Sequence, residues 1–555
     1  METSMFARRL VALLLLILSV SACSSEADIG EPFDFSKVSP EWKAHAAKLA
    51  ASSPSPIGIN VNAPVDWTTS FPFVDIFRVS RPFFAEDGAE VTFDRHGWVK
   101  TFNNRGSVSS PLWWDIPPRM MPRGDYVVRW DGKGRMQFNC AKVKQEEKNR
   151  AVIHLGGSGC GLYLKIKQSD NGDPVRNIRI TMPGGICEGN PFEQVKDASA
   201  CGERRFLSFE EHAREIVFNP AFLAFLRDFS VLRFMDAGDT NDSEIAHWSQ
   251  RPVLEDATWQ DRGFPVEIIV QLGNLLQRDI WVTLPHKADD DYVRRYARYV
   301  KAHLDPKLKV FVEYSNEVWN GMFAQNRYAR EQGVARKLDE NIYHAGWRYY
   351  SERSVEIFRI WEQVFGGAER LVRIMGSQTA DPWMSNLLLS HKDAWKHTDA
   401  LAVAAYFGVE MDREGAPDLR RISQAGLIEH VSKVEIPRLL AILKKNREVA
   451  DKYDLPLVAY EGGQHFVGIG DDVNDPKIKA LFTGVNRNPA IKRLYDELYR
   501  GWKHIGGTLF VHYAAPSLYS KWGSWGIKEY LYEPREEAPK YDATLEFIEK
   551  NPKWW

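Results

Sequence analysis

Short apolar runs recur along the chain from residue 57 onward, and polar, helix-like stretches separate most of them. The runs occupy residues 57–62, 231–235, 280–284, 308–315, 371–375, 400–406, 455–461 and 508–513. Continuous apolar runs that alternate with helical stretches are typical of strands buried in a parallel sheet. The pattern predicts an α/β protein with a (β/α)8 TIM barrel, in which each βα unit takes roughly 30 residues.

A long insertion separates the first two runs. Inside it, short segments alternate apolar and polar positions between Gly, Asp and Asn turns: 126–130, 135–138, 151–154, 162–166 and 175–180. This pattern predicts an inserted antiparallel β-sandwich-like domain between strands one and two. The expected divisions are the barrel start at 46–72, the insertion at 73–205, and the remaining barrel with a C-terminal strap at 206–555. The insertion either shields the barrel or serves as a binding or cleft-lining module, and both interpretations stay open.

The N-terminus has features of an exported protein. Residues 1–22 predict a signal peptide, because two arginines precede an apolar run that is too short to span a membrane. The sequence Val20-Ser-Ala-Cys23 resembles a bacterial lipobox, whose Cys becomes lipidated, and residues 23–45 would form a polar tether. Ser24 resembles the outer-membrane sorting pattern of Gram-negative lipoproteins. A lipid-anchored protein of the bacterial envelope is predicted, with ordinary secretion and an incidental Cys as the alternative.

The remaining cysteines are an even set inside the insertion, at Cys140, Cys160, Cys187 and Cys201. Disulfides form and persist in exported proteins, and four cysteines allow three connectivities. We favour Cys140 with Cys160, which could join neighbouring strands, and Cys187 with Cys201, which would close a polar loop. Zinc binding is the alternative, but the sequence has no Cys-x-x-Cys spacing to support it.

Charge and aromatic content limit the kinds of partner. The chain has 72 basic and 74 acidic residues, a formal net charge of -2, so nothing indicates nucleic acid. Nineteen Trp, 20 Tyr and 29 Phe are ample for stacking on sugar rings, although most large aromatic residues fill cores. A neutral polysaccharide is compatible with this composition.

Two apolar runs have a glutamate at or just after their end. Glu317 follows the run 308–315, and Glu461 ends the run 455–461. Glycoside hydrolysis needs two such carboxyl groups, one to protonate the leaving oxygen and one to attack or stabilise the anomeric carbon. The 144 residues between the two glutamates accommodate three βα units, which places them on strands four and seven. These strands face each other across the mouth of a barrel.

Ser315-Asn316-Glu317, together with Glu461 on a later strand, resembles the retaining (β/α)8 glycoside hydrolases called clan A, over residues 57 to about 526. The resemblance implies that Glu317 is the acid/base and Glu461 the nucleophile. It also implies that Arg233 and Tyr406 support the nucleophile, with a structural salt bridge and a core tyrosine as alternatives. Asn316 would hold a neighbouring sugar hydroxyl. The longer string Tyr314-Ser-Asn-Glu-Val-Trp-Asn320 also resembles bacterial proteins labelled cellulose-binding.

Further substrate-binding candidates lie near strand ends. His286 follows the run 280–284 and could bind sugar hydroxyls or orient the acid/base, or be structural. The other candidates are Trp319, Gln464, His465, and a possible sugar platform of Trp522 and Trp525. Residues 289–291 are three aspartates that suit a helix start better than a metal site, and no metal or cofactor is predicted.

The leading hypothesis is a retaining glycoside hydrolase that acts on a polysaccharide or oligosaccharide. The alternative is a non-catalytic carbohydrate-binding surface lipoprotein that kept the barrel and its aromatic cleft. The pair of glutamates discriminates between them, because a binding protein does not need two carboxylates at catalytic spacing.

Overall fold

The computed structural model describes residues 29–156, 160–411, 413 and 415–555. Its centre is a closed barrel of parallel strands, which confirms the predicted TIM barrel. In barrel order the strands are β1 (Ile57–Asn60), β14 (Val231–Arg233), β15 (Asp279–Leu284), β16 (Val310–Tyr314), β17 (Leu371–Gly376), β18 (Ala400–Gly408), β19 (Leu457–His465) and β20 (Gly507–His512). Each apolar run predicted as a barrel strand overlaps one of them.

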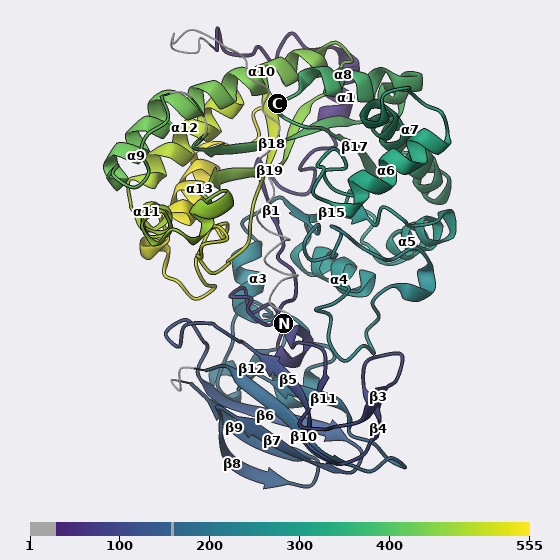
Figure 1. The fold of residues 1–555 in the computed structure, drawn as a ribbon, viewed down its shortest axis with the longest axis vertical. Coiled ribbons are helices and arrows are strands. Elements are labelled where there is room, and N and C mark those ends of the chain that lie inside the picture. The colour runs from purple at the N-terminus through teal and green to yellow at the C-terminus, as the bar shows by residue number, and fades with distance from the viewer. Residues whose placement is uncertain (1–28, 157–159, 412, 414) are drawn as a thin grey trace.

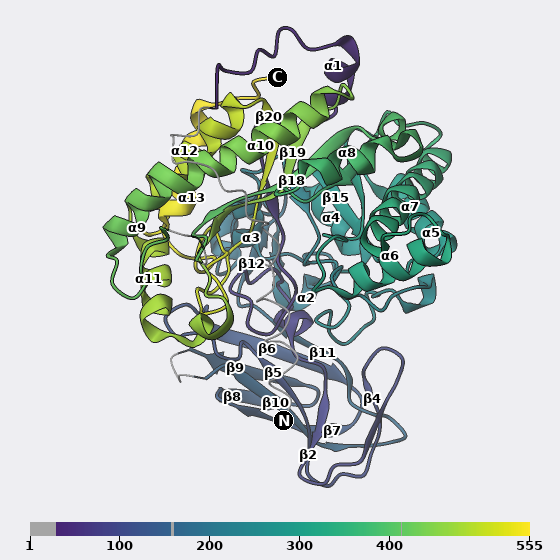
Figure 2. The ribbon, with the colours of Figure 1, turned by 45° about the horizontal axis from the view of Figure 1, so that its top comes forward.

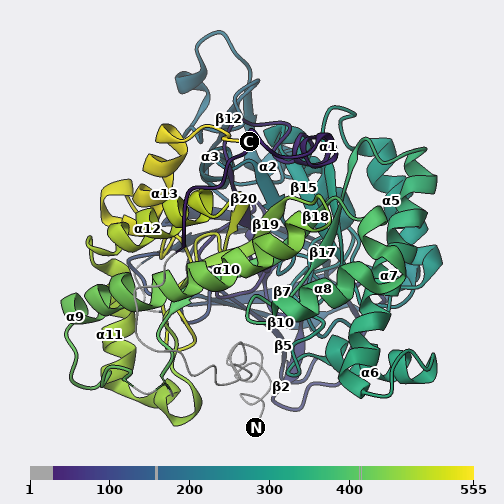
Figure 3. The same ribbon diagram turned by 90° about the horizontal axis from the view of Figure 1, so that it is seen from above.

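Helices surround these strands, as the view from above shows (Figure 3). They are α3 (Pro220–Leu226), α4 (Val266–Leu276), α5 (Asp290–His303), α6 (Ala324–Ala335), α7 (Ile342–Phe365), α8 (Pro382–Ser390), α9 (Gln424–His430), α10 (Ile436–Asp451), α11 (Pro476–Arg487), α12 (Ile491–His504) and α13 (Pro539–Lys550). The aspartates at 289–291 start α5, where the Asp289 carboxylate caps the Tyr292 amide at 2.7 Å. Acidic residues there stabilise the positive end of the helix dipole.

One end of the barrel is closed by both termini of the described chain. The indole of Trp555 donates to the carbonyl of Ala46 in α1 (Pro40–Ala46), and Trp554 donates to the carbonyl of Gly507 at the start of β20. The predicted C-terminal strap therefore packs back onto the N-terminal end of the strands. The carboxyl ends of the strands lie at the opposite end, where the functional sites of this fold gather.

The insertion forms a β-sandwich at the end of the barrel opposite α1 (Figures 1 and 2). One sheet has the order β2-β5-β10-β7 and the other β11-β6-β9-β8, with two small two-stranded sheets beside them. The strands are β2 (Phe84–Glu86), β3 (Val91–Phe93), β4 (Val99–Phe102), β5 (Ser107–Leu112), β6 (Gly124–Asp131), β7 (Gly134–Asn139), β8 (Lys142–Glu147), β9 (Arg150–Leu155), β10 (Leu162–Ser169), β11 (Arg176–Thr181), β12 (Gly185–Cys187) and β13 (Phe206–Ser208).

The sandwich borders the end of the barrel at which the strands have their carboxyl ends. The Trp114 amide donates to the carbonyl of Asp66, and the Asp66 carboxylate pairs with Arg81 at 2.9 Å. Asp66 lies in the loop that leaves β1 at its carboxyl end, so the insertion is attached to the rim of the barrel mouth.

Ser208, Glu210 and Glu211 predict the start of a helical stretch that runs towards Asp228, but the segment is not one continuous helix. It contains two short helices, α2 (Phe209–His212) and α3. Between them Phe218 pairs with Phe73 in an isolated β-bridge, and Pro220 then starts α3 at a position where its missing amide costs no helical hydrogen bond.

Both favoured disulfides are present. Cys140 bonds to Cys160 and Cys187 bonds to Cys201. The predicted signal peptide, Cys23 and the first part of the tether lie outside the described residues. Within the described ranges, no helix combines the length and apolar character needed to cross a membrane.

Removing the Cys187–Cys201 bond should destabilise the insertion. The two residues are 14 positions apart, and closing a loop of about 15 residues stabilises a fold by about 3 kcal/mol in the chain-entropy model. We expect the Cys187→Ser/Cys201→Ser variant to unfold at lower denaturant concentration under oxidising conditions. Reducing agent should then cost the variant less stability than it costs the wild type. Equal losses on reduction would contradict the prediction.

Candidate active site

Arg233 is the centre of a buried polar network inside the barrel mouth. It ends β14, and its side chain is fully buried. Its guanidinium pairs with Glu313 through Nε (3.1 Å) and Nη2 (3.0 Å), and with Glu461 through Nη1 at 2.8 Å. Nη1 also donates to Asn60 at 3.0 Å, and Nη2 donates to Asn316 at 2.9 Å. Arg233 lies inside an apolar run, and two carboxyl groups from other strands balance its buried charge.

Glu461 lies within β19 and faces this network. Its Oε1 accepts the bond from Arg233, and its Oε2 accepts the Tyr406 hydroxyl at 2.9 Å. The strand does not end at Glu461, as the sequence indicated, but continues to His465, because β18 extends alongside it and pairs with residues 462–465. Two donors thus fix the orientation of this carboxyl group.

Glu317 lies just beyond the carboxyl end of β16. Its φ of 42° and that of Ser315, 59°, turn the backbone sharply after the strand. One carboxyl oxygen accepts the Tyr460 hydroxyl at 2.9 Å, and the other accepts the Asn320 amide at 3.0 Å. Tyr460 precedes Glu461 in β19, so a single strand holds the nucleophile candidate and orients the acid candidate.

The two candidate carboxyls have different electrostatic surroundings. Burial, together with the charge of Glu461, raises the pKa of Glu317 to about 7. Burial also raises the pKa of Glu461, but the Arg233 charge and the hydrogen bonds from Arg233 and Tyr406 oppose that rise. Glu317 has no bonded cation among the described residues, so its surroundings favour the neutral form more strongly than those of Glu461 do. Such a difference between two carboxyl groups is typical of a general acid and a nucleophile.

Glu313 is a buried carboxylate that the sequence analysis did not single out. It lies in β16, and in addition to Arg233 it accepts the Trp281 indole at 2.7 Å. Burial raises its pKa, and the Arg233 charge opposes the rise. The signal was available, because residue 313 is an acid inside an apolar run, as Arg233 is a base inside another.

Asp236 is a second carboxylate that the candidate set omitted. It follows β14 by three residues, and its Oδ2 accepts the Tyr513 hydroxyl at 2.8 Å. Burial raises its pKa to about 6, and the charge of Glu461 adds to that rise. Its position at the end of the run 231–235 is the sequence feature that could have identified it.

Aromatic side chains pack against the ring of Tyr406 and against one another. The Trp525 ring lies 5.9 Å from that of Tyr406, 4.9 Å from that of His465 and 5.8 Å from that of Tyr513, all edge to face. The Trp525 indole donates to the carbonyl of Trp522, and both tryptophans are half-buried. The structure thus places Trp525 beside the carboxylate network, and the proposed platform role stays a prediction.

Three other candidates have contacts within the protein. Gln464 donates to the Ser524 carbonyl at 2.8 Å and accepts the Phe466 amide at 2.8 Å, so its side-chain amide braces the Trp525 loop. His286 is buried with its ring 5.3 Å from Tyr328, and burial lowers its pKa to about 4. Trp319 packs edge to face against Tyr460. Their contacts with substrate stay predictions.

Asn316 is bonded within the protein, and its predicted contact with a sugar hydroxyl stays a prediction. Its Oδ1 accepts from Arg233, and its Nδ2 donates to Asn241 at 3.1 Å.

In the described part of the chain, no group of three or more His, Cys, Asp or Glu side chains is placed to hold a metal ion.

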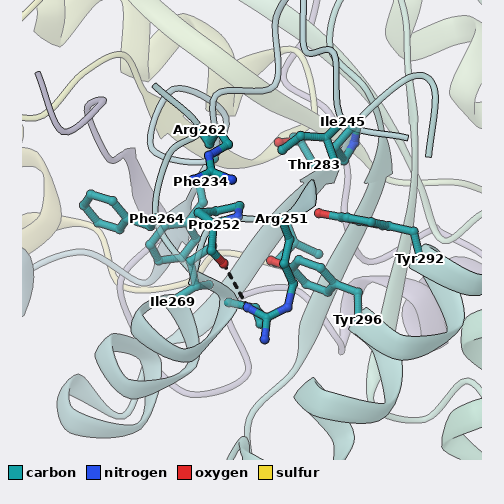
Figure 4. A pocket seen from close by; sticks show the side chains of 14 residues that line it. Phe234, Ile245, Arg251, Pro252, Arg262, Phe264, Ile269, Thr283, Tyr292 and Tyr296 are labelled. Atoms are coloured by element: carbon teal, nitrogen blue, oxygen red, sulfur yellow. Dashed lines mark hydrogen bonds between the residues drawn. The ribbon is translucent and has the colours of Figure 1, made fainter. Parts of the chain in front are cut away.

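A separate pocket lies away from these carboxyls, between the barrel and helices α4 and α5 (Figure 4). It is lined by residues including Phe234, Arg251, Thr283, Tyr292 and Tyr296. Arg251 there donates to the Pro252 carbonyl at 2.8 Å. Neither Glu317 nor Glu461 lines this pocket, so it is not part of the candidate site.

Replacing Arg233 by Met should destabilise the fold. The change leaves Glu313 and Glu461 buried without their cation, and breaking a buried ion pair typically costs about 3–5 kcal/mol. Because the orphaned carboxyls would bind protons in the folded state, the loss should be greater at pH 8 than at pH 5. Denaturant unfolding at the two pH values measures it. A loss below about 1 kcal/mol at pH 8 would contradict the buried-pair argument.

No protein-family model and no curated protein matches the chain. Among solved structures, it is similar to a 4-O-α-L-rhamnosyl-β-D-glucuronidase from Fusarium oxysporum, at 11% identity and a TM-score of 0.37. That match covers 59% of this chain and 65% of the Fusarium chain, just under two thirds of its length. A β-glucosidase from Thermotoga maritima matches at 9% identity, over 60% of this chain and 85% of that one, with a TM-score of 0.34. The xylanase 10B modules of Clostridium thermocellum match at 9%, over 87% and 98%, with a TM-score of 0.33.

Proposed function

We propose that this protein is a retaining glycoside hydrolase that acts on a polysaccharide or oligosaccharide. The observation that carries the proposal is the pair formed by Glu317, just beyond the carboxyl end of β16, and Glu461 in β19. Arg233 and Tyr406 stabilise Glu461 as an anion, and the pKa of Glu317 is raised to about 7. Glycosidic cleavage requires these two different carboxyl states at one mouth.

The proposed reaction has two steps. Glu317 donates its proton to the glycosidic oxygen, while a carboxylate oxygen of Glu461 attacks the anomeric carbon and the C–O bond to the leaving sugar breaks. Glu317, now ionised, then takes a proton from water, which attacks the same carbon and releases Glu461. Retention is proposed because Arg233 and Tyr406 hold Glu461 in a fixed orientation and favour its charged form, as a carboxylate nucleophile requires. In an inverting enzyme the second carboxyl group would instead activate a water molecule.

A polysaccharide panel tests the proposal. Purified protein lacking residues 1–28 is incubated with β-linked glucans, mannans, galactans, xylans and arabinose-containing polymers, and new reducing ends are measured. We expect cleavage of at least one polymer, with NMR showing that the first-formed product retains the substrate's anomeric configuration. Binding without any new reducing ends would favour a non-catalytic carbohydrate-binding protein. An inverted product would retain the hydrolase and exclude the covalent step.

We also propose a lipid anchor at Cys23 that holds the barrel at a membrane of the bacterial envelope, most consistent with the outer membrane. The support is the sequence Val20-Ser-Ala-Cys23 and the polar residues that follow it. In cells, the Cys23→Ala variant should move from the membrane fraction to the soluble fraction. If the variant stays as membrane-bound as the wild type, the anchor is elsewhere.

A further inference from the structure

Asp236 presents a carboxyl oxygen that the protein does not use. Its Oδ2 accepts the Tyr513 hydroxyl at 2.8 Å, whereas no donor among the described residues is bonded to its Oδ1. Unlike Arg233, Asp236 is partly exposed. The Tyr513 ring that holds it packs edge to face against Tyr406, at 6.3 Å, and against Trp525. Asp236 therefore opens onto the same mouth as the carboxyl groups of the candidate site.

Arg233 has no hydrogen-bond donor left for a ligand. A guanidinium carries five N–H groups, and Arg233 directs one to Glu461, two to Glu313, one to Asn60 and one to Asn316. It is also fully buried. Among the described residues, Arg233 is the only basic side chain that hydrogen-bonds to Glu313 or Glu461, and none bonds to Asp236 or Glu317. The anion-binding capacity of the site is thus consumed within the protein.

Acidic groups outnumber basic groups in this network. Glu313 and Glu461 supply two carboxyl groups to the single guanidinium of Arg233, and no basic side chain among the described residues pairs with Asp236. A sugar hydroxyl can donate to Asp236 Oδ1 and Glu461, whereas a sugar carboxylate would meet like charges in a poorly solvated place. This arrangement favours binding of a sugar ring that carries no charge.

We propose that Asp236 is a specificity-determining residue, which accepts a hydrogen bond from a hydroxyl of the bound sugar and rejects sugars that carry a carboxylate. The substrate class is then a neutral glycan rather than a uronic-acid polymer. This inference rests on the proposed function, because it assumes that the sugar lies against Glu461.

The rejection should depend on pH. The groups that act on Asp236 are the Tyr513 hydroxyl, Glu461 and Arg233, and with burial they set its pKa at about 6. Below that value Asp236 is neutral, and above it Asp236 is charged. Discrimination against acidic sugars should therefore increase as the pH rises through 6.

Matched ligand pairs test the inference. Cellohexaose, mannohexaose and β-1,4-galactohexaose are each compared with the same hexaose oxidised at its primary hydroxyls to carboxylates. Binding is measured by calorimetry at pH 5 and pH 7.5 in a Glu317→Gln background, which slows turnover. We expect at least one neutral hexaose to bind, and its oxidised partner to bind at least tenfold more weakly at pH 7.5. The difference should narrow at pH 5.

Two variants separate the charge from the hydrogen bond. Asp236→Asn keeps an acceptor and removes the charge, so it should reduce the discrimination at pH 7.5 to less than threefold. Asp236→Ala should weaken binding of the neutral hexaose at least fivefold. Glu244→Gln is the control, because it removes one negative charge from the exposed pair with Lys287 and should leave the discrimination unchanged.

The outcomes distinguish this inference from the proposed hydrolysis. It is overturned if the oxidised hexaose binds as tightly as the neutral one, if no neutral hexaose binds, or if Asp236→Asn leaves the discrimination unchanged. If the variants behave as expected but the wild type cleaves none of the hexaoses, hydrolysis fails and the specificity stands. If the wild type cleaves oxidised and neutral hexaoses equally, hydrolysis stands and the specificity fails.

Discussion

Replacing Glu461 by Gln should lower kcat by roughly 10⁴-fold or more on every substrate that the wild type cleaves. The amide is nearly isosteric, but it cannot form the glycosyl ester, and activated and unactivated leaving groups should suffer alike. In the smaller variant Glu461→Ala, azide should restore turnover of activated aryl glycosides by attacking the anomeric carbon. The rescued product should be a glycosyl azide of inverted configuration, because only one displacement then occurs.

The control for this prediction is Glu331→Gln, which neutralises an exposed glutamate on α6 and should retain full activity. Circular dichroism and the unfolding midpoint show whether each variant is folded. A folded Glu461→Gln variant with more than about one tenth of wild-type kcat would rule out Glu461 as the nucleophile and redirect attention to the carbohydrate-binding alternative.

The sequence was most informative where local pattern decides structure. The apolar runs that contain β16 and β19 are long and continuous, because parallel strands are buried on both faces. Because Glu317 and Glu461 follow or end these two runs, the sequence alone predicts that both lie at the mouth of the barrel. The extension of β19 to His465 was missed because it depends on pairing with β18, and a glycine pair at 462–463 does not indicate a strand by itself.

Side-chain pairs between residues far apart in the sequence could not be predicted from the hydrophobic pattern. Arg233 and Glu313 were each visible as a charge in an apolar run, but they lie 80 positions apart, and Arg233 and Glu461 lie 228 apart. Which acid meets which base follows from the strand order and the tilt of the barrel rather than from local sequence. The same holds for Tyr460, whose hydroxyl reaches Glu317 across 143 positions.

Some strands of the sandwich were missed for a different reason, which is their polar composition. All six residues of β8 are exposed, in the sequence Lys-Val-Lys-Gln-Glu-Glu, so no apolar face marks the strand. The strand is formed by backbone pairing with β9 at the edge of its sheet, where charged side chains also discourage pairing with another chain. Serine-rich β5 is buried throughout, yet its polar composition resembles a loop.

Replacing Glu317 by Gln should have an effect that depends on the leaving group. For an unactivated oligosaccharide, loss of the general acid should lower kcat/KM by roughly 10²–10⁴-fold, because the departing sugar oxygen needs a proton. A dinitrophenyl glycoside leaves without protonation, so its kcat/KM should change by less than about tenfold. Its kcat should still fall, because Glu317 also activates the water that releases the intermediate, and azide should accelerate that second step.

The pH profile provides the complementary test of the same residue. The acid must be protonated to act, and burial with the Glu461 charge raises its pKa to about 7, so wild-type kcat/KM on an oligosaccharide should fall as the pH rises past 7. The Gln side chain does not titrate, and this alkaline limb should be absent from the small residual activity of the variant. If the alkaline limb persists unchanged in the variant, another group causes it. Asp236, whose pKa burial raises to about 6, is then the first candidate. Equal losses on both classes of leaving group would instead remove Glu317 from the acid role, since only proton donation makes the damage depend on what departs.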